Sequence, residues 1–220
     1  MIINPNFAQG IHSPSGRGEG RGGMLPSAYL APIAYFQMLI DFETIWIEHF
    51  ENFEKQTCRS RCEIYSPNGI QTLSIPLVKR NHKQTMKEVK ISYDYNWQHL
   101  HWRSLESAYR RSPFFEYYED DFNPYYHQKK FEYLIDLNEE MQQLLMSLLK
   151  IKKKYIFTQE YKATLTETVD FRRADLLSSK ESNTTGRPYN QVFETRFGFI
   201  PNLSVIDLLF NQGPRALDYI

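Results

Sequence analysis

Glycine is scarce in most of this 220-residue chain. Six of the ten glycines fall within the first 23 residues, which leaves four for the remaining 197. A glycine-rich stretch ahead of a glycine-poor body indicates two segments of different character. We predict a flexible tail over residues 1–23 and one folded domain over residues 24–220. On this interpretation the tail is dispensable, and a chain that starts at Met24 is expected to fold.

Cysteine is equally scarce, and neither sign of charge is in excess. The two cysteines, Cys58 and Cys62, are too few for a disulfide framework or a four-cysteine zinc site. Lys plus Arg and Asp plus Glu both number 26, so no overall field favours DNA. We therefore expect reduced thiols and no DNA partner.

Long hydrophobic runs are missing as well. The first 23 residues lack the apolar run of about 7–15 residues that a signal peptide needs. Prolines interrupt the apolar stretch over residues 25–40, which falls short of the roughly 20 residues of a membrane span. These absences predict a cytoplasmic protein without a transmembrane segment.

Common catalytic motifs are absent too, including the P-loop, GxGxxG, GxSxG and HExxH. Their absence argues against the common kinases, α/β-hydrolases and zincins. The sequence indicates no metal site and identifies no cofactor, and it leaves the oligomeric state open.

The first part of the body has strand-like and helical runs in alternation. Residues 24–30 are extended in character, Pro32 can start a helix through residue 37, and residues 44–47 form a strand pattern. Two extended runs, 62–65 and 71–77, flank an Asn-Gly pair that predicts an antiparallel hairpin. Alternation over residues 89–93 predicts one more strand.

The second part is mainly helical. Apolar residues at spacings of three and four predict helices over residues 97–109 and 129–149, and a third near residues 204–212. Residues 158–194 are polar and poorly periodic, so we expect a long irregular connection there. The fold class predicted is α/β (or α+β): one domain with a mixed sheet, a β-hairpin and a helical layer.

His101 is the candidate general base. It lies on the apolar face of the predicted 97–109 helix, whereas His99 lies on the opposite face, so the two cannot share a metal. An inward histidine at a pocket wall can take up a proton near neutral pH. The alternative is a buried histidine that is hydrogen-bonded within the core.

Basic residues gather just before the hairpin at Lys55, Arg59 and Arg61. Extended spacing would place Arg59 and Arg61 on one face, where they could hold a phosphate or carboxylate together. The alternative is a solvated charged loop. Catalysis by a cysteine beside these cations is a further hypothesis, since nearby cations lower a thiol's pKa, but no histidine partner is defined for it.

Residues 93–133 hold 14 of the 33 aromatic residues, including Trp102, and eight of the 14 are tyrosines. Rings with polar tips suit the faces of sugars or nucleobases, although core packing is the alternative for each ring. The neighbouring acidic run contains Asp120 and Asp121, which could hold a cation or act as a base unless the loop is simply solvated. Asp207 is interpreted as part of a helix cap that begins at Ser204.

Four blocks of the sequence resemble the WbqC-like family of bacterial proteins. They are LPSAYLAP at residues 25–32, KQTCRSRC at 55–62, WQHLHW at 97–102 with Tyr109 and 113–115, and PNLSVIDLLFN at 201–211. One departure is Leu25, where many members of the broader family have a glutamine. The resemblance implies a cytoplasmic bacterial protein of O-antigen or other surface-polysaccharide synthesis, which transfers glycine or another acyl group to an amino sugar.

Three functional hypotheses follow. In the first, an enzyme acts on a nucleotide- or lipid-linked amino sugar: Arg59 and Arg61 hold its phosphate, and His101 is the base. The remaining substrate-binding candidates are Lys55, Trp102, Asp121, Tyr189 and Gln191. In the second, a non-catalytic protein binds a glycan precursor or a partner enzyme. The third, RNA binding through Lys150–Lys154 and the basic connector over residues 79–83, ranks lower because the net charge is zero.

Overall fold

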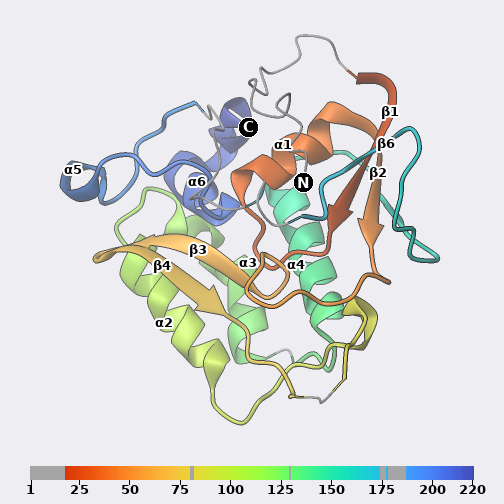
Figure 1. Cartoon of the computed structure of the whole chain (residues 1–220). Helices are drawn as coiled ribbons and strands as arrows, with labels where there is room; N and C mark the ends of the chain where they lie inside the picture. The colour runs from red at the N-terminus through yellow and green to blue at the C-terminus, as the bar shows by residue number, and fades with distance from the viewer. Residues whose placement is uncertain (1–17, 80–81, 129, 174–176, 178–186) are drawn as a thin grey trace, which may run out of the picture.

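The computed structural model describes residues 18–79, 82–128, 130–173, 177 and 187–220. These residues form one mixed α/β domain with six α-helices, a four-stranded sheet and a two-stranded hairpin. The predicted fold class is therefore confirmed. Figure 1 shows the four-stranded sheet on one side of the domain and the hairpin with its underlying helices on the other.

The four-stranded sheet is parallel throughout. Its strands are β1 (Gly18–Pro26), β2 (Phe42–Glu48), β5 (Ile156–Phe157) and β6 (Thr168–Asp170), in the order β5-β2-β1-β6. Helix α1 (Ile33–Asp41) connects β1 to β2 and gives the predicted β-α-β opening. Because all strands run the same way, their carboxyl ends lie along one edge of the sheet.

The hairpin consists of β3 (Arg61–Ser66) and β4 (Gly69–Ser74). Ser66 pairs with Gly69, so Pro67 and Asn68 form a two-residue turn. Gly69 has a φ of 93°, a conformation that glycine adopts without steric cost. The hairpin prediction is confirmed, although β4 ends at Ser74 rather than at residue 77.

Helix α2 (Trp97–Tyr109) has the predicted bounds, and α3 (Phe115–His127) follows it. Helix α4 (Leu134–Leu148) begins five residues later than predicted, because Tyr133 is extended and bridges to Lys90. That bridge and the one between Leu77 and Ile91 are isolated, so the strand predicted over residues 89–93 is wrong. The chain ends with α5 (Glu194–Phe197), α6 (Val205–Gln212) and a 3-10 helix over Gly213–Tyr219.

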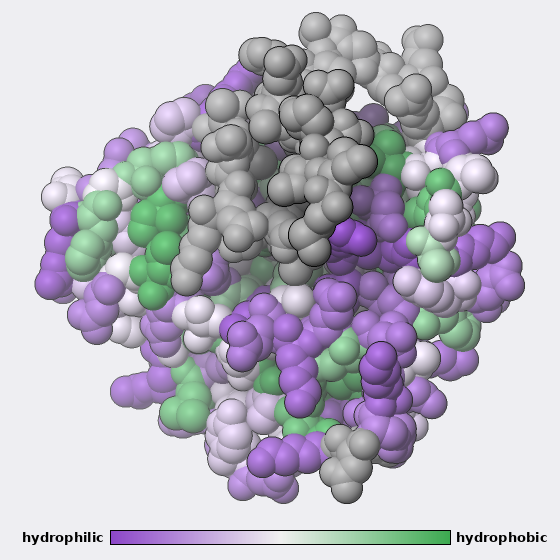
Figure 2. Space-filling view, in the orientation of Figure 1, coloured by the Kyte–Doolittle hydropathy of each residue, from purple (hydrophilic) through white to green (hydrophobic). Residues whose placement is uncertain are grey.

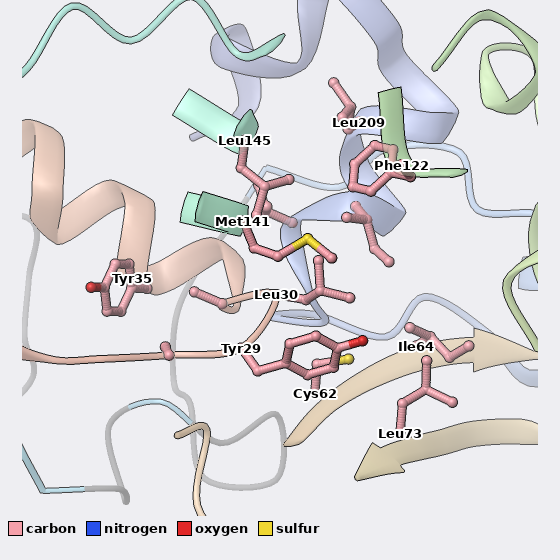
Figure 3. Packing of buried hydrophobic residues seen from close by; sticks show 14 of the residues in the cluster. Tyr29, Leu30, Tyr35, Cys62, Ile64, Leu73, Phe122, Met141, Leu145 and Leu209 are labelled. Carbon is pink, nitrogen blue, oxygen red and sulfur yellow. The ribbon is translucent and has the colours of Figure 1, made fainter. Parts of the chain in front are cut away.

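The core joins both sides of the domain. Buried side chains from α1, α4, α6 and the hairpin pack into one cluster that includes Tyr29, Leu30, Ile64, Met141 and Leu209. Figure 3 shows Cys62 and Tyr29 together in this packing, beside the hairpin. On the described surface seen in Figure 2, hydrophilic and hydrophobic residues are interspersed. No described helix has the length and apolar character needed to cross a membrane.

The boundary predicted for the tail needs correction. Strand β1 begins at Gly18, and Gly22 and Gly23 pair with β2 on one side and β6 on the other. A Cβ at Gly22 would lie 2.0 Å from a ring carbon of Trp46, so glycine permits the close approach of these strands. The prediction for residues 1–17 lies outside the described residues.

A chain that begins at Met24 is therefore expected to be less stable than one that begins at Gly18. It loses the ladder hydrogen bonds of Gly22 and Gly23 to two neighbouring strands. Such bonds contribute about 0.5–1.5 kcal/mol each, so we expect a loss of about 2 kcal/mol or more. Urea denaturation of both chains measures this difference. Equal midpoints would show that the first half of β1 adds nothing to stability.

Candidate functional site

Three segments that are distant in the sequence meet beside the hairpin. They are the β1–α1 connection, the loop before β3 and the segment before α6. The backbone N–H of Tyr29 donates to the carbonyl of Cys58 at 2.9 Å, and that of Ile33 donates to Leu203 at 3.0 Å. The N–H of Ser204 donates to the carbonyl of Glu63 at 2.9 Å. These bonds hold the three segments as one rigid unit.

A cleft opens where the three segments meet. Its cavity volume is about 90 Å³. The β1–α1 connection contributes Leu30 and Pro32 to its lining, and the segment before α6 contributes Asn202 and Ser204. The loop before β3 and the first part of β3 supply Gln56, Thr57, Cys58, Arg61, Cys62 and Glu63, and Leu177 completes the lining. We call this space the Arg61 cleft.

Backbone strain is concentrated at the Arg61 cleft. Among the described residues, five other than glycine have a positive φ, and three of these line the cleft: Leu30 (43°), Gln56 (65°) and Asn202 (53°). Such conformations cost about 1–3 kcal/mol each and cluster at functional sites, where the surrounding structure enforces them. The strain marks this cleft as the candidate site.

Arg61 is the cation of the cleft. Its side chain is half-buried, and its Nε is buried without a hydrogen-bond partner. Within the described part of the chain, no carboxylate lies within 4.0 Å of its guanidinium. A partly desolvated guanidinium without an acidic partner is placed to bind an anion.

Arg59 has the opposite environment. Its side chain is 1% exposed, and Nε and Nη2 each donate to a carboxylate oxygen of Glu51 at 2.7 Å. Nη1 donates to Thr57 Oγ1, and Nη2 also donates to the carbonyl of Arg172. The structure therefore does not bring Arg59 and Arg61 together as the predicted pair, because protein groups occupy the guanidinium of Arg59.

A second buried ion pair lies next to the first. Arg172 Nη1 donates to Glu48 at the end of β2, while Nε and Nη2 donate to Asp170 at the end of β6. The carboxyl edge of a parallel sheet is where α/β proteins commonly bind ligands. Here the two ion pairs occupy that edge. Thr57, which accepts from Arg59, connects the edge to the Arg61 cleft.

His101 lies in the core and does not line the Arg61 cleft. Its Nε2 lies 3.3 Å from the carbonyl oxygen of Ser74, which can only accept, so Nε2 carries the proton. Its Nδ1 then accepts from the Tyr29 hydroxyl at 3.0 Å, and Tyr126 donates to Tyr29 at 2.8 Å. Burial lowers the pKa of His101 to about 4, so the ring is neutral at pH 7 and both nitrogens have partners.

The two thiols line the Arg61 cleft but are poor nucleophiles. Burial raises the pKa of Cys58 to about 12, and the nearby Arg59 only partly offsets this effect. Burial also raises the pKa of Cys62 above its ordinary value. Since the thiolate is the reactive form, neither cysteine is activated at neutral pH. Nowhere among the described residues do three His, Cys, Asp or Glu side chains form a group that could hold a metal ion.

Tyr189 and Gln191 converge on Asp207. The carboxylate of Asp207 is 0% exposed and accepts from the hydroxyls of Tyr109 at 2.9 Å and Tyr189 at 2.7 Å, and from Gln191 Nε2 at 3.0 Å. Burial raises its pKa to about 6, although these hydrogen bonds oppose the shift. The helix-cap interpretation of Asp207 is wrong: the Ser204 N–H donates to Glu63 instead.

The remaining predicted residues lie apart from the Arg61 cleft. Lys55 is exposed in the loop before β3, and Asp121 is exposed on α3. Trp102 is buried among the rings of Phe115, Tyr126 and His127. None of these three side chains contributes to the lining of the cleft.

Several residues of the site escaped the sequence analysis. Three of them, Leu30, Gln56 and Asn202, are uncharged residues with a left-handed backbone conformation. Residue type alone does not predict this conformation, although Asn adopts it more readily than most residues. Glu48, Glu51 and Arg172 lie in different segments, so only the fold brings them together. One sequence pattern could have pointed to the site: Arg61 and Glu63 are two residues apart, and residues at that spacing share a face of a strand.

The comparisons with known proteins identify one family. A family model described as the WbqC-like protein family matches residues 27–185. The chain is also 26% identical to "Uncharacterized protein Rv1507c" of Mycobacterium tuberculosis over 222 residues, which cover 90% of this chain and 96% of that protein. No solved structure matches.

Proposed function

Since the chain belongs to the WbqC-like protein family, we propose that it binds the phosphate of an amino-sugar precursor in the Arg61 cleft and serves bacterial surface-polysaccharide synthesis. The ligand class is an amino sugar 1-phosphate, a group shared by nucleotide-linked and lipid-linked sugars. A cytoplasmic location is part of this proposal. The dispersal of His101, Arg59 and Asp121 favours binding over the catalytic arrangement expected from the sequence.

The observation that carries the proposal is that the buried Nε of Arg61 has no hydrogen-bond partner among the described residues. A charged group that is partly removed from water loses hydration, and a partner must compensate this loss. Arg59, two residues earlier, obtains that compensation from Glu51, whereas the Nε of Arg61 is buried without a described hydrogen-bond partner and the residue lines an open cleft. A guanidinium matches the geometry of phosphate oxygens and can form two parallel hydrogen bonds to them.

The rest of the lining suits a small polar ligand with an apolar face. Thr57, Glu63 and Ser204 provide oxygen atoms, while Leu30, Pro32 and Leu177 provide apolar surface. The carboxylate of Glu63 complements a protonated amine, as Arg61 complements a phosphate. A ligand with both charges therefore fits better than a simple anion.

A second candidate function is acyl or aminoacyl transfer to the sugar amine, and Glu63 favours it. The amine would attack the carbonyl carbon of an activated acyl donor, so that an amide C–N bond forms and the donor's leaving group departs. Glu63 would accept the amine proton. It replaces His101 as the proposed base because both ring nitrogens of His101 are bonded within the core. A Glu63→Gln variant that binds glucosamine 1-phosphate but has lost turnover would support this function.

The binding proposal is tested by replacing Arg61 with Met. Calorimetric titration with glucosamine 1-phosphate is expected to show at least a tenfold weaker affinity for Arg61→Met than for the wild-type protein. The reason is the loss of the charge-assisted hydrogen bonds to phosphate, which are worth about 1.5–3 kcal/mol.

Arg103→Met is the matched control, because Arg103 is exposed on α2 and lies outside the cleft. It should bind as the wild type does. Parallel titrations with UDP-N-acetylglucosamine and farnesyl diphospho-N-acetylglucosamine distinguish a nucleotide carrier from a lipid carrier. Equal affinities of Arg61→Met and wild type for all three ligands would contradict the proposal.

A further inference from the structure

A second hollow adjoins the Arg61 cleft. It is small, with a cavity volume of about 20 Å³, and lies between the start of α1, the segment over residues 187–202 and the C-terminal 3-10 helix. Its distinctive wall consists of three aromatic rings, Tyr189, Phe199 and Tyr219. We call these three residues the aromatic wall.

The rings of the aromatic wall meet at near right angles. Phe199 lies 5.4 Å from Tyr189 with an interplanar angle of 87°, and Tyr219 lies 6.1 Å from Tyr189 at 73°. Tyr189 is held in place because its hydroxyl donates to the buried carboxylate of Asp207 at 2.7 Å. The planes of Phe199 and Tyr219 are therefore both steeply inclined to that of Tyr189, so the three rings form a corner rather than a stack.

Polar groups lie at the border of this corner. Gln37 is half-buried. Arg187 is exposed, and its Nη1 donates to the carbonyl oxygen of Asp218. Aromatic faces attract the weakly positive C–H groups of a pyranose ring, while amide and guanidinium groups bond its hydroxyls. The combination of a fixed aromatic corner with peripheral donors favours a sugar ring over a purely apolar ligand.

Asn202 connects the two spaces. It lines both the Arg61 cleft and the hollow, has a φ of 53°, and its Oδ1 accepts from the backbone N–H of Ala34 at 2.9 Å. Leu30 and Pro32 line the cleft, and the next two residues, Ile33 and Ala34, line the hollow. The two spaces are therefore neighbours along one continuous stretch of wall.

We infer that the cleft and the hollow form one bipartite site, in which Arg61 binds the phosphate of an amino sugar 1-phosphate and the aromatic wall binds its pyranose ring. This inference rests on the proposed function and assigns the sugar-binding part of the site. It also accounts for the left-handed conformation of Asn202, since this residue forms part of the wall of both spaces.

The test compares glucosamine 1-phosphate with inorganic phosphate by calorimetric titration of the full chain. Wild-type protein is expected to bind the sugar phosphate at least tenfold more tightly than phosphate. Phe199→Leu removes the ring but keeps apolar volume, and it should lower the affinity for the sugar phosphate about fivefold or more while leaving phosphate affinity unchanged. Phe197→Leu is the matched control, because Phe197 is exposed on α5 and does not line the hollow.

The possible results distinguish a failure of sugar binding by the aromatic wall from a failure of phosphate binding by Arg61. If Arg61→Met loses phosphate affinity but Phe199→Leu keeps the full preference for the sugar phosphate, the aromatic wall does not bind the sugar and the inference alone is overturned. If Arg61→Met binds phosphate as the wild type does, the proposed function fails. A loss in Phe199→Leu that Phe197→Leu reproduces equally would also overturn the inference.

Discussion

Replacing Arg59 with Met is expected to lower the free energy of unfolding by about 3–5 kcal/mol, because the substitution leaves the carboxylate of Glu51 buried without its partner. Glu51 accepts two hydrogen bonds of 2.7 Å from Arg59. The substitution also removes the donors to Thr57 and to the carbonyl of Arg172. Equilibrium denaturation in urea at pH 7 measures the loss.

Arg61→Met is the natural control for this experiment, since the two arginines are two residues apart. Arg61 has no acidic partner in the part of the chain that the structure describes, so its replacement should change the free energy of unfolding by no more than about 1 kcal/mol. A second variant, Arg59→Met with Glu51→Leu, should recover part of the loss, because an apolar pair leaves no buried charge. Equal losses for Arg59→Met and Arg61→Met would contradict the distinction between the two residues.

The stability of the wild-type protein relative to Asp207→Asn is expected to fall by about 3 kcal/mol as the pH rises from about 3.5 to 7. Burial raises the pKa of Asp207 from its ordinary value of 3.8 to about 6 in the folded chain. Between these two values the folded chain keeps a proton that the unfolded chain has released. Raising the pH therefore favours unfolding, and a pKa difference of about 2 corresponds to about 3 kcal/mol.

Urea denaturation of both proteins over this pH range tests the prediction, because other groups titrate alike in both and cancel in the difference. Tyr189→Phe sharpens the test: it removes a donor that stabilises the charged carboxylate, so the loss of stability with rising pH should be larger than in the wild type. A stability difference between wild type and Asp207→Asn that does not depend on pH would show that Asp207 titrates normally.

Much of the fold could be predicted because its signals are local. The Asn68-Gly69 pair and the flanking alternation predict the hairpin, although its turn residues are Pro67 and Asn68, and the apolar spacing from Trp97 to Tyr109 predicts α2. The failures involve pairing over long distances. In the sequence the glycines of β1 look like those of a flexible tail, because only the fold brings Trp46 of β2 against Gly22. Helix α4 begins later than predicted because Tyr133 bridges to Lys90.

The site was harder to predict than the fold. Arg59 and Arg61 belong to one basic cluster, and no local signal separates the arginine that pairs with Glu51 from the one that faces the cleft. Tyr189 and Gln191 lie close together in the sequence as substrate-binding candidates, but the capping spacing at Ser204 predicts a helix cap for Asp207, their common partner in the structure. Buried charges find their partners through the tertiary fold, which single-sequence patterns do not encode.

The most direct measurement is the NMR signal of the Arg61 Nε–H, assigned by its loss in Arg61→Met and followed while glucosamine 1-phosphate is added. The central claim is that the Arg61 guanidinium, whose Nε has no partner among the described residues, binds the phosphate of the ligand, so that its Nε–H signal reports ligand binding. We predict a saturable shift of the Arg61 signal, while the Nε–H of Arg59, already bonded to Glu51, stays in place. An Arg61 signal that does not move at saturating ligand, or one that moves no more than that of Arg59, would contradict the account.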